Sequence, residues 1–176
     1  MRIHRLFILI LLAMLTHGAA AQEVRFVSSR HSPLKQTGTI EPNEVTFSGN
    51  VQVSGTFEVV WEPGTEGSPG YFRVVLRPNK ASRAFLPHDS QHGEVREIWL
   101  RNTHAAIRAF LSPAQTKTLM SSHTRRATGS VAVILNSYRT GVDCDLRGYN
   151  ASFVSVVRRS SNVVAGAPAR ESIGGC

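Results

Sequence analysis

Hydrophobic and polar residues alternate along residues 45–62. Every odd position from 45 to 61 is apolar or glycine, and every even position except Val60 is polar. Successive side chains of a β-strand point to opposite faces, so the pattern predicts a long strand with one buried and one solvent-exposed face. Gly49 and Gly55 fall on the buried face, where a missing side chain indicates a bend, a bulge or a close backbone approach. A small closed barrel needs a long first strand that bends in this way.

The same kind of pattern predicts four further strands. Phe72, Val74 and Leu76 lie on one face of the second strand, which ends before Pro78. The fourth strand is almost continuously apolar, as expected for a strand that is covered on both faces. The four predicted segments are residues 71–77, 95–101, 130–138 and 148–158.

Two short helical segments are predicted between the third and fourth strands. Asn102 has the residue type of a helix cap, and residues 104–111 carry apolar side chains at spacings of three and four. Ser112 and Gln115 form a capping-box pattern, which predicts a second helical turn that reaches about residue 120.

This order of elements resembles the OB-fold, a mainly β, five-stranded and partly open barrel. The shared features are a long bent first strand, three strands before the helix, and two strands after it. The resemblance covers residues 45–159 and concerns the fold alone, so it assigns no functional residue. Another small β-barrel and a β-sandwich with one helix are the alternatives.

The N-terminus has the composition of a secretory signal peptide. Arg2 and Arg5 precede an apolar run at residues 6–15, and small residues lead up to Gln22. A membrane span needs roughly 20 apolar residues, and this run has about half that length, so we do not expect it to stay in a membrane. We expect cleavage after Ala21, the last of the small residues. The expected organisation is a signal peptide (residues 1–21), an N-terminal arm or linker (22–43), an OB-like barrel (44–159) and a flexible tail (160–176).

Charge and cysteine content narrow the possible partners. The chain has 20 Lys and Arg and 12 Asp and Glu, a formal net charge of +8, and two of the basic residues lie in the predicted signal peptide, which leaves +6. A basic protein favours nucleic acid, an anionic glycan or a lipid head group as ligand, although scattered charges also serve solubility. In an oxidising compartment, Cys144 and Cys176 are expected to form a disulfide that tethers the tail.

One group of side chains has the residue types of a metal site. His88, Asp89 and His92 lie close together, with His104 twelve residues after His92. Two histidines four residues apart share a zinc ion when their segment is helical, but Pro87 and a glycine bracket this one as a loop. His88 and His92 are therefore weak metal candidates, and we expect exposed loop histidines, no metal and no cofactor.

No sequence motif indicates catalysis. The chain contains neither GxSxG nor GxxxxGK[ST], and the predicted disulfide accounts for both cysteines. Asp143 and Asp145 are paired carboxylates in a glycine-containing loop, where such residues are usually solvated. We therefore expect no catalytic residue and favour a non-enzymatic domain, with a hydrolase that uses unidentified residues as an alternative.

The barrel interpretation places one set of chemically useful side chains on the outer face of the second and third strands. If Phe72 and its neighbours face the core, then Tyr71, Arg73, Arg77 and Trp99 face outward together with Glu97. That face is a usual ligand site of OB-folds, and aromatic rings beside guanidinium groups stack on bases or sugar rings. The alternative is that Trp99 packs under the helices and the arginines keep a strand edge soluble.

The sequence thus predicts a secreted or periplasmic binding module. Its ligand is expected to be anionic: a glycan, a nucleic acid or a lipid head group. A protein-interaction or inhibitor module, whose exposed strand edge binds a protein partner, is the alternative.

Overall fold

The computed structural model describes residues 26–27, 31–41, 44–121, 125–143, 146–159 and 164–168. Its strands are β1 (Phe26–Val27), β2 (Lys35–Glu41), β3 (Glu44–Ser48), β4 (Val51–Glu62), β5 (Tyr71–Pro78), β6 (His88–Asp89), β7 (Ile98–Leu100), β8 (Arg125–Asp143), β9 (Leu146–Arg159) and β10 (Val164–Pro168). Its helices are α2 (Lys80–Arg83), α3 (Thr103–Phe110) and α4 (Pro113–Met120).

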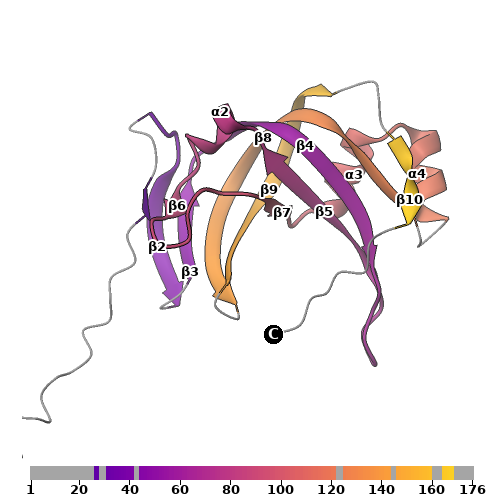
Figure 1. Cartoon of the computed structure of the whole chain (residues 1–176), viewed down its shortest axis with the longest axis horizontal. Coiled ribbons are helices and arrows are strands. Elements are labelled where there is room, and N and C mark those ends of the chain that lie inside the picture. Colours follow the sequence, from indigo (N-terminus) through magenta and orange to yellow (C-terminus); the bar gives the residue numbers. More distant parts are fainter. Residues whose placement is uncertain are drawn as a thin grey trace, which may run out of the picture.

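Five of these strands close into a barrel (Figure 1). The hydrogen-bonded order is β4, β5, β7, β9 and β8, and β8 returns to β4. All neighbours are antiparallel except β7 and β9, which run parallel with Trp99 opposite Asn150. The helices α3 and α4 follow the third barrel strand and precede the fourth. The protein is therefore a mainly β, OB-like five-stranded barrel, as predicted.

The predicted first strand is interrupted at Gly49, and the backbone of β5 approaches it closely at Gly55. Gly49 has φ of 106°, which ends β3, and β4 begins two residues later. A β-carbon on Gly49 would lie 2.4 Å from the carbonyl oxygen of Pro33. At Gly55, a β-carbon would lie 2.1 Å from the carbonyl oxygen of Arg77 in β5. Both glycines therefore do what the sequence indicated: one allows a bend and the other a close backbone approach.

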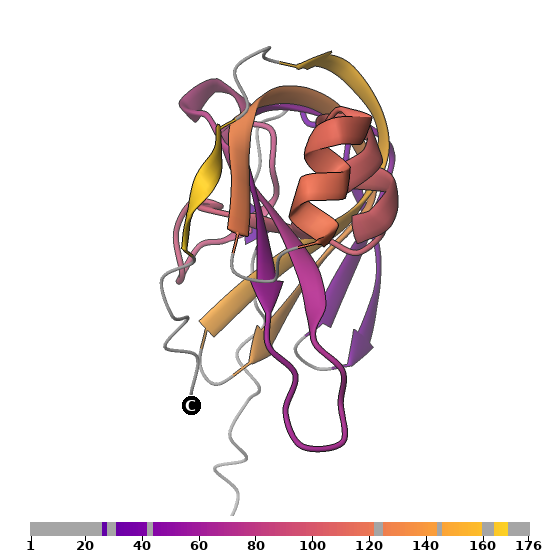
Figure 2. The same ribbon diagram turned by 90° about the vertical axis from the view of Figure 1, so that its right-hand side faces the viewer.

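The core is built from the predicted alternation. Val53, Phe57 and Val59 of β4 are at most 1% exposed, and the ring of Phe57 lies 4.9 Å from that of Phe110 in α3. Figures 1 and 2 show α3 and α4 together at one end of the barrel, with the β2–β3 hairpin at the other. Figure 2 also shows the β4–β5 hairpin projecting beyond the barrel.

The two helices begin in different ways. At α4, the predicted capping box is present: the Ser112 amide donates to Gln115 Oε1 at 2.8 Å, and the Gln115 amide donates to Ser112 Oγ at 3.3 Å. At α3, Asn102 occupies the cap position, but its side chain makes no cap hydrogen bond. Instead the side-chain Nδ2 of Asn102 donates to the Phe153 carbonyl, and its Oδ1 accepts from the Phe153 N–H, both at 2.7 Å. Asn102 therefore joins the start of α3 to β9.

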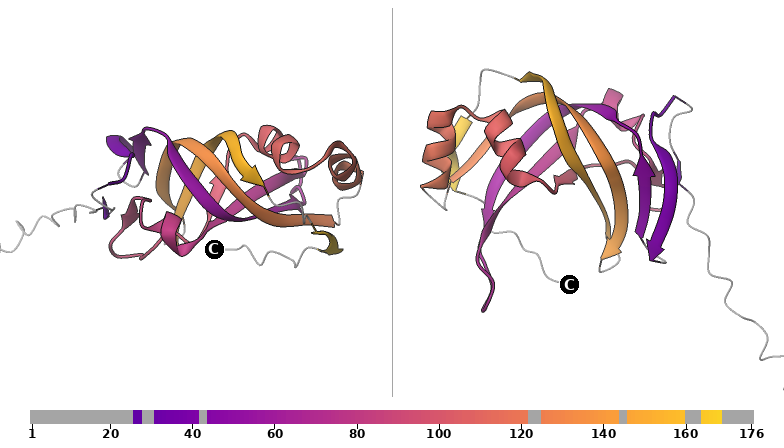
Figure 3. Two further views of the ribbon diagram at one scale, coloured as in Figure 1. Left: turned by 90° about the horizontal axis from the view of Figure 1, so that it is seen from above. Right: turned by 180° about the vertical axis from the view of Figure 1, so that it is seen from behind.

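Several segments differ from the sequence-based expectation. The third barrel strand is only Ile98–Leu100, and the arm before the barrel contributes β1 and β2. The segment expected to be a flexible tail contains β10, which pairs with β8 beyond the end of β9 (Figure 3). Backbone pairing requires no alternation of side chains, so these additional strands have little signature in the sequence.

Some predictions concern residues outside the described ranges. The signal peptide, Cys144 and Cys176 all lie there, so the cleavage site and the disulfide stay predictions. Among the described residues, no helix has both the length and the apolar character needed to cross a membrane.

Candidate functional site

The outer face of β5 and β7 carries two exposed aromatic side chains. Tyr71 is 58% exposed and Trp99 is 48% exposed, so Trp99 does not pack under the helices. In the sheet register Trp99 lies opposite Val75, between the positions of Arg73 and Arg77. The guanidinium carbon of Arg73 lies 4.9 Å from the centre of the Trp99 ring. Arg73, Arg77 and Trp99 are thus brought together, and Tyr71 lies further along β5, opposite Glu62.

Carboxylates of the neighbouring strand and loop pair with the arginines of this face. Arg73 forms an ion pair with Glu62, and Arg77 contacts Glu58 at 2.7 Å and Glu97 at 3.7 Å. Arg126 of β8 contacts Glu58 from the other side at 3.1 Å. Trp99 Nε1 donates to Glu97 at 3.1 Å, which fixes the orientation of the indole. We name this surface the aromatic face; its members are Glu58, Glu62, Tyr71, Arg73, Arg77, Glu97, Trp99 and Arg126.

The aromatic face carries no surplus charge, because its three arginines are matched by three glutamates. Burial alone would raise the pKa of Glu58, but the hydrogen bond from Arg77 and the charges of Arg77 and Arg126 outweigh that effect. The pKa of Glu58 is consequently below its ordinary value, and its ion pairs persist into mildly acidic solution. Glu58 and Glu62 occupy outward positions of the first strand, so the sequence shows that these carboxylates share the face of the arginines. Predicting which arginine each one pairs with requires the register of β4 against β5.

The histidine segment is only in part the exposed loop that we expected: His92 is exposed, but the start of the segment is not. His88 and Asp89 form β6, paired with β1, and Asp89 is fully buried. Asp89 Oδ1 accepts from the Gln91 amide at 2.8 Å, and Oδ2 lies 2.8 Å from His92 Nδ1 and 2.9 Å from Arg147 Nη2. The Arg147 side chain is only 3% exposed, so this is a buried ion pair that fastens β6 to β9.

The other polar candidates do not converge on a site. His88 Nδ1 lies 3.3 Å from the Leu86 carbonyl, and His104 is exposed on α3. The described residues hold no group of three or more His, Cys, Asp or Glu placed to share a metal ion. Asp143 ends β8, whereas Asp145 lies outside the described residues.

Comparisons with models of protein families, with curated proteins and with solved structures found no match to this chain. The fold and the aromatic face define the protein only by class, as a small OB-like barrel with an exposed, charge-balanced aromatic surface on its second and third strands. Its function therefore has to be argued from its own residues.

Proposed function

We propose that the protein is a non-enzymatic binding module that acts outside the cytoplasm and recognises a glycan on its aromatic face. The observation that carries this proposal is the half-exposed Trp99 ring with the Arg73 guanidinium above it. An indole held by a hydrogen bond to Glu97 is a preorganised surface for stacking. Strands two and three of OB-folds commonly bind oligosaccharides and oligonucleotides.

The charge balance favours a saccharide over a nucleic acid. Binding of nucleic acid draws most of its affinity from unpaired Lys and Arg that neutralise phosphates. The arginines of the aromatic face are each paired with a glutamate, so they offer directed hydrogen bonds more than net charge. A sugar ring stacks on an indole, and its hydroxyls bond to both the guanidinium and the carboxylate groups around it.

Replacing Trp99 with alanine is expected to weaken glycan binding by about 1 to 3 kcal/mol, because a stacking contact of that size is lost. Stability should fall by only about 1 kcal/mol or less, since the ring is half exposed and mainly loses its contact with Arg73. Titration of cell-wall glycan fragments at two salt concentrations, together with a thermal melt, measures both quantities.

The matched control is Phe85→Ala, which removes another exposed aromatic ring that lies outside the aromatic face. Its affinity for the glycan should equal that of the unaltered protein. Equal binding by Trp99→Ala would contradict the proposal. Tight binding of single-stranded DNA with a steep salt dependence would assign the face to nucleic acid instead.

The proposed location rests on the predicted signal peptide and on the two cysteines. Mass spectrometry of the exported protein is expected to find Gln22 as the first residue and a Cys144–Cys176 disulfide. In the chain-entropy model, closing a loop of this length stabilises the fold by about 3 to 4 kcal/mol. Retention of residues 1–21, or free thiols in the non-reduced protein, would contradict this part of the proposal.

A protein-interaction module is the second candidate, and a feature of the sheet favours it. Among the described strands, β2 pairs with β3 on one side only, so its other edge is available for strand addition. Capture of a protein partner with an affinity that Trp99→Ala leaves unchanged would favour this function.

A further inference from the structure

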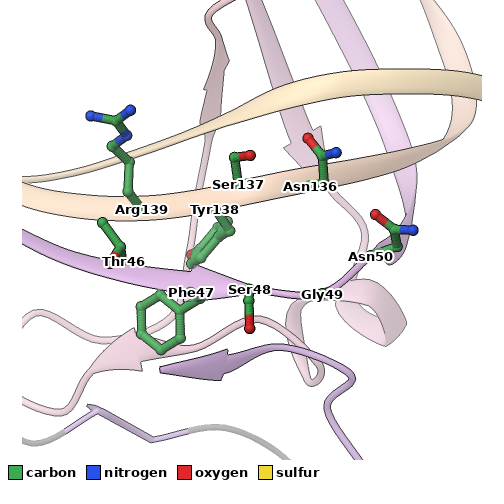
Figure 4. Close-up of a pocket in the computed structure, with 9 residues that line it drawn as sticks. All are labelled: Thr46, Phe47, Ser48, Gly49, Asn50, Asn136, Ser137, Tyr138 and Arg139. Atoms are coloured by element: carbon green, nitrogen blue, oxygen red, sulfur yellow. The ribbon is translucent and has the colours of Figure 1, made fainter. Parts of the chain in front are cut away.

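The sheet opens locally between β3–β4 and β8. These strands are paired at Thr46 with Arg139 and again at Val51 with Leu135. Between these points, residues 47–50 face residues 136–138 without register partners across the opening. A pocket of about 410 Å³ occupies this opening (Figure 4). Its volume lies within the range of about 300 to 1,000 Å³ that small-molecule sites have.

Polar side chains gather on the outer side of this pocket. In Figure 4, Asn50, Asn136, Ser137 and Arg139 project to the same side of the sheet, whereas Phe47 projects to the other. Within the described part of the chain, the side-chain amides of Asn50 and Asn136 have no hydrogen-bond partner. Phe47 and Tyr138 also line the pocket, but at 5% and 0% exposure their rings belong to the core. The accessible amides and hydroxyls of the other lining residues suit the hydroxyls of a sugar ring.

The backbone at the pocket is strained and held in place. Ser137 has a backbone φ of 48°, a conformation that residues other than glycine rarely adopt. Arg101, directly after β7, donates to the Ser137 carbonyl at 2.9 Å and to Ser152 Oγ at 3.1 Å. Strained residues that the surrounding structure fixes are concentrated at binding and catalytic sites.

Arginines outnumber carboxylates in the ion-pairing groups beside the pocket, unlike at the aromatic face. Arg139 lines the pocket and pairs with Glu44 at 3.0 Å, whereas Arg101 does not line it but donates to the carbonyl of the pocket residue Ser137. Two guanidinium groups are therefore offset by one carboxylate. Burial lowers the pKa of Arg101, and the positive charge of Arg139 lowers it further, which means that the two cations repel each other. A bound anion would relieve this repulsion.

We propose that the pocket between β3–β4 and β8 binds a saccharide unit that carries a carboxylate. Arg139, supported by Arg101, bonds the carboxylate, while Asn50 and Asn136 bond the ring hydroxyls. The site is separate from the aromatic face, because Trp99 does not line the pocket. This proposal therefore does not depend on the ligand of that face.

The test is a titration of the purified protein with D-glucuronate, D-glucose and inorganic phosphate at constant ionic strength, followed by amide chemical shifts. Glucuronate is expected to shift the amides of residues 46–50 and 136–139 and to bind at least about tenfold more tightly than glucose, since a hydrogen bond to a charged group is worth that much. Arg139→Gln should make the affinities for glucuronate and glucose similar. Asn136→Ala should weaken the binding of both sugars and leave the ratio of their affinities unchanged.

Two control variants separate this site from the rest of the molecule. Arg108→Gln removes the same charge from α3, and Phe85→Ala removes an exposed ring that belongs to neither the pocket nor the aromatic face, so both should bind glucuronate as the unaltered protein does. Absence of saturable shifts at the pocket with glucuronate would overturn the proposal. Phosphate that competes as tightly as glucuronate would also overturn it, because the pocket would then be a simple anion site. Loss of glucuronate binding in Trp99→Ala would place the sugar on the aromatic face instead.

Discussion

Replacing Asp89 with asparagine is expected to lower the free energy of unfolding by about 3 to 5 kcal/mol, which is the usual cost of breaking a buried ion pair from one side. Asp89 is fully buried, and the side chain of Arg147 is 3% exposed. An asparagine keeps the shape but removes the negative charge that compensates the guanidinium. Its amide keeps one oxygen that can accept from the Gln91 amide, but its NH2 group cannot accept the bonds that Asp89 Oδ2 accepts from His92 and Arg147. Chemical denaturation at pH 7 measures the difference.

The effect should depend on pH in a defined direction. Burial raises the pKa of Asp89, but the Gln91 amide, His92 and Arg147 outweigh burial and lower it below the ordinary value. A carboxyl with a depressed folded-state pKa contributes its stability above the unfolded-state pKa of about 3.9 and loses it as the pH falls through the folded-state pKa. The stability difference between the protein and Asp89→Asn is therefore expected to be full at pH 6 to 7 and to shrink below about pH 4.

An exposed ion pair provides the matched control. Arg83 and Glu94 lie 3.6 Å apart with side chains 32% and 61% exposed, so Glu94→Gln should cost about 1 kcal/mol or less. The double variant Asp89→Asn, Arg147→Met should recover part of the loss, because no buried charge is left without its counterpart. A loss for Asp89→Asn no larger than that for Glu94→Gln would show that the buried pair does not stabilise the fold.

Replacing Gly55 with alanine is expected to destabilise the protein by about 1 to 3 kcal/mol or more. The new β-carbon would lie 2.1 Å from the Arg77 carbonyl oxygen and 3.0 Å from the Pro78 α-carbon. Both are backbone atoms of β5, so no side chain can rotate away, and the two barrel strands have to separate. Thermal and denaturant unfolding measure the loss.

Gly148 is the control for this substitution, since it also lies in a barrel strand. A β-carbon there would meet nothing closer than the Gly141 carbonyl oxygen at 3.9 Å. Gly148→Ala should be neutral or stabilise by about 0.4 to 1 kcal/mol, because alanine restricts the unfolded chain. If Gly55→Ala were equally neutral, β4 and β5 would not approach as closely as described.

The barrel was predictable because its pattern is local. Six of the odd residues of the first strand are buried in the structure (Val45, Phe47, Val51, Val53, Phe57 and Val59), and the order of strands and helices along the chain specifies the OB-like closure. Gly55 could be recognised from its position on the buried face alone. The cap at Asn102 was harder to predict, since its side chain bonds to Phe153, which is 51 residues away.

The candidate sites were only partly predictable, because they depend on contacts between distant segments. Exposure of Trp99 followed from alternation, whereas the pairing of Arg77 with Glu58 required the register of two strands. The burial of Asp89 could not be read from a segment bracketed by Pro87 and a glycine, since its partner Arg147 comes 58 residues later. The pocket at Ser137 arises from a gap in strand pairing inside a segment whose sequence indicates an uninterrupted strand.

The short parallel contact between β7 and β9 has a consequence for motion within the molecule. This contact closes the barrel through two register pairs, extended by the Arg101 amide to Ala151 and by the Asn102 side chain to Phe153. On its other side β7 pairs with β5 through two register pairs as well, so the amides along Ile98–Leu100 should exchange with solvent through local opening before those of β4 or β8. Because Trp99 lies on this strand and Arg101 directly follows it, a ligand at either proposed site would slow that exchange.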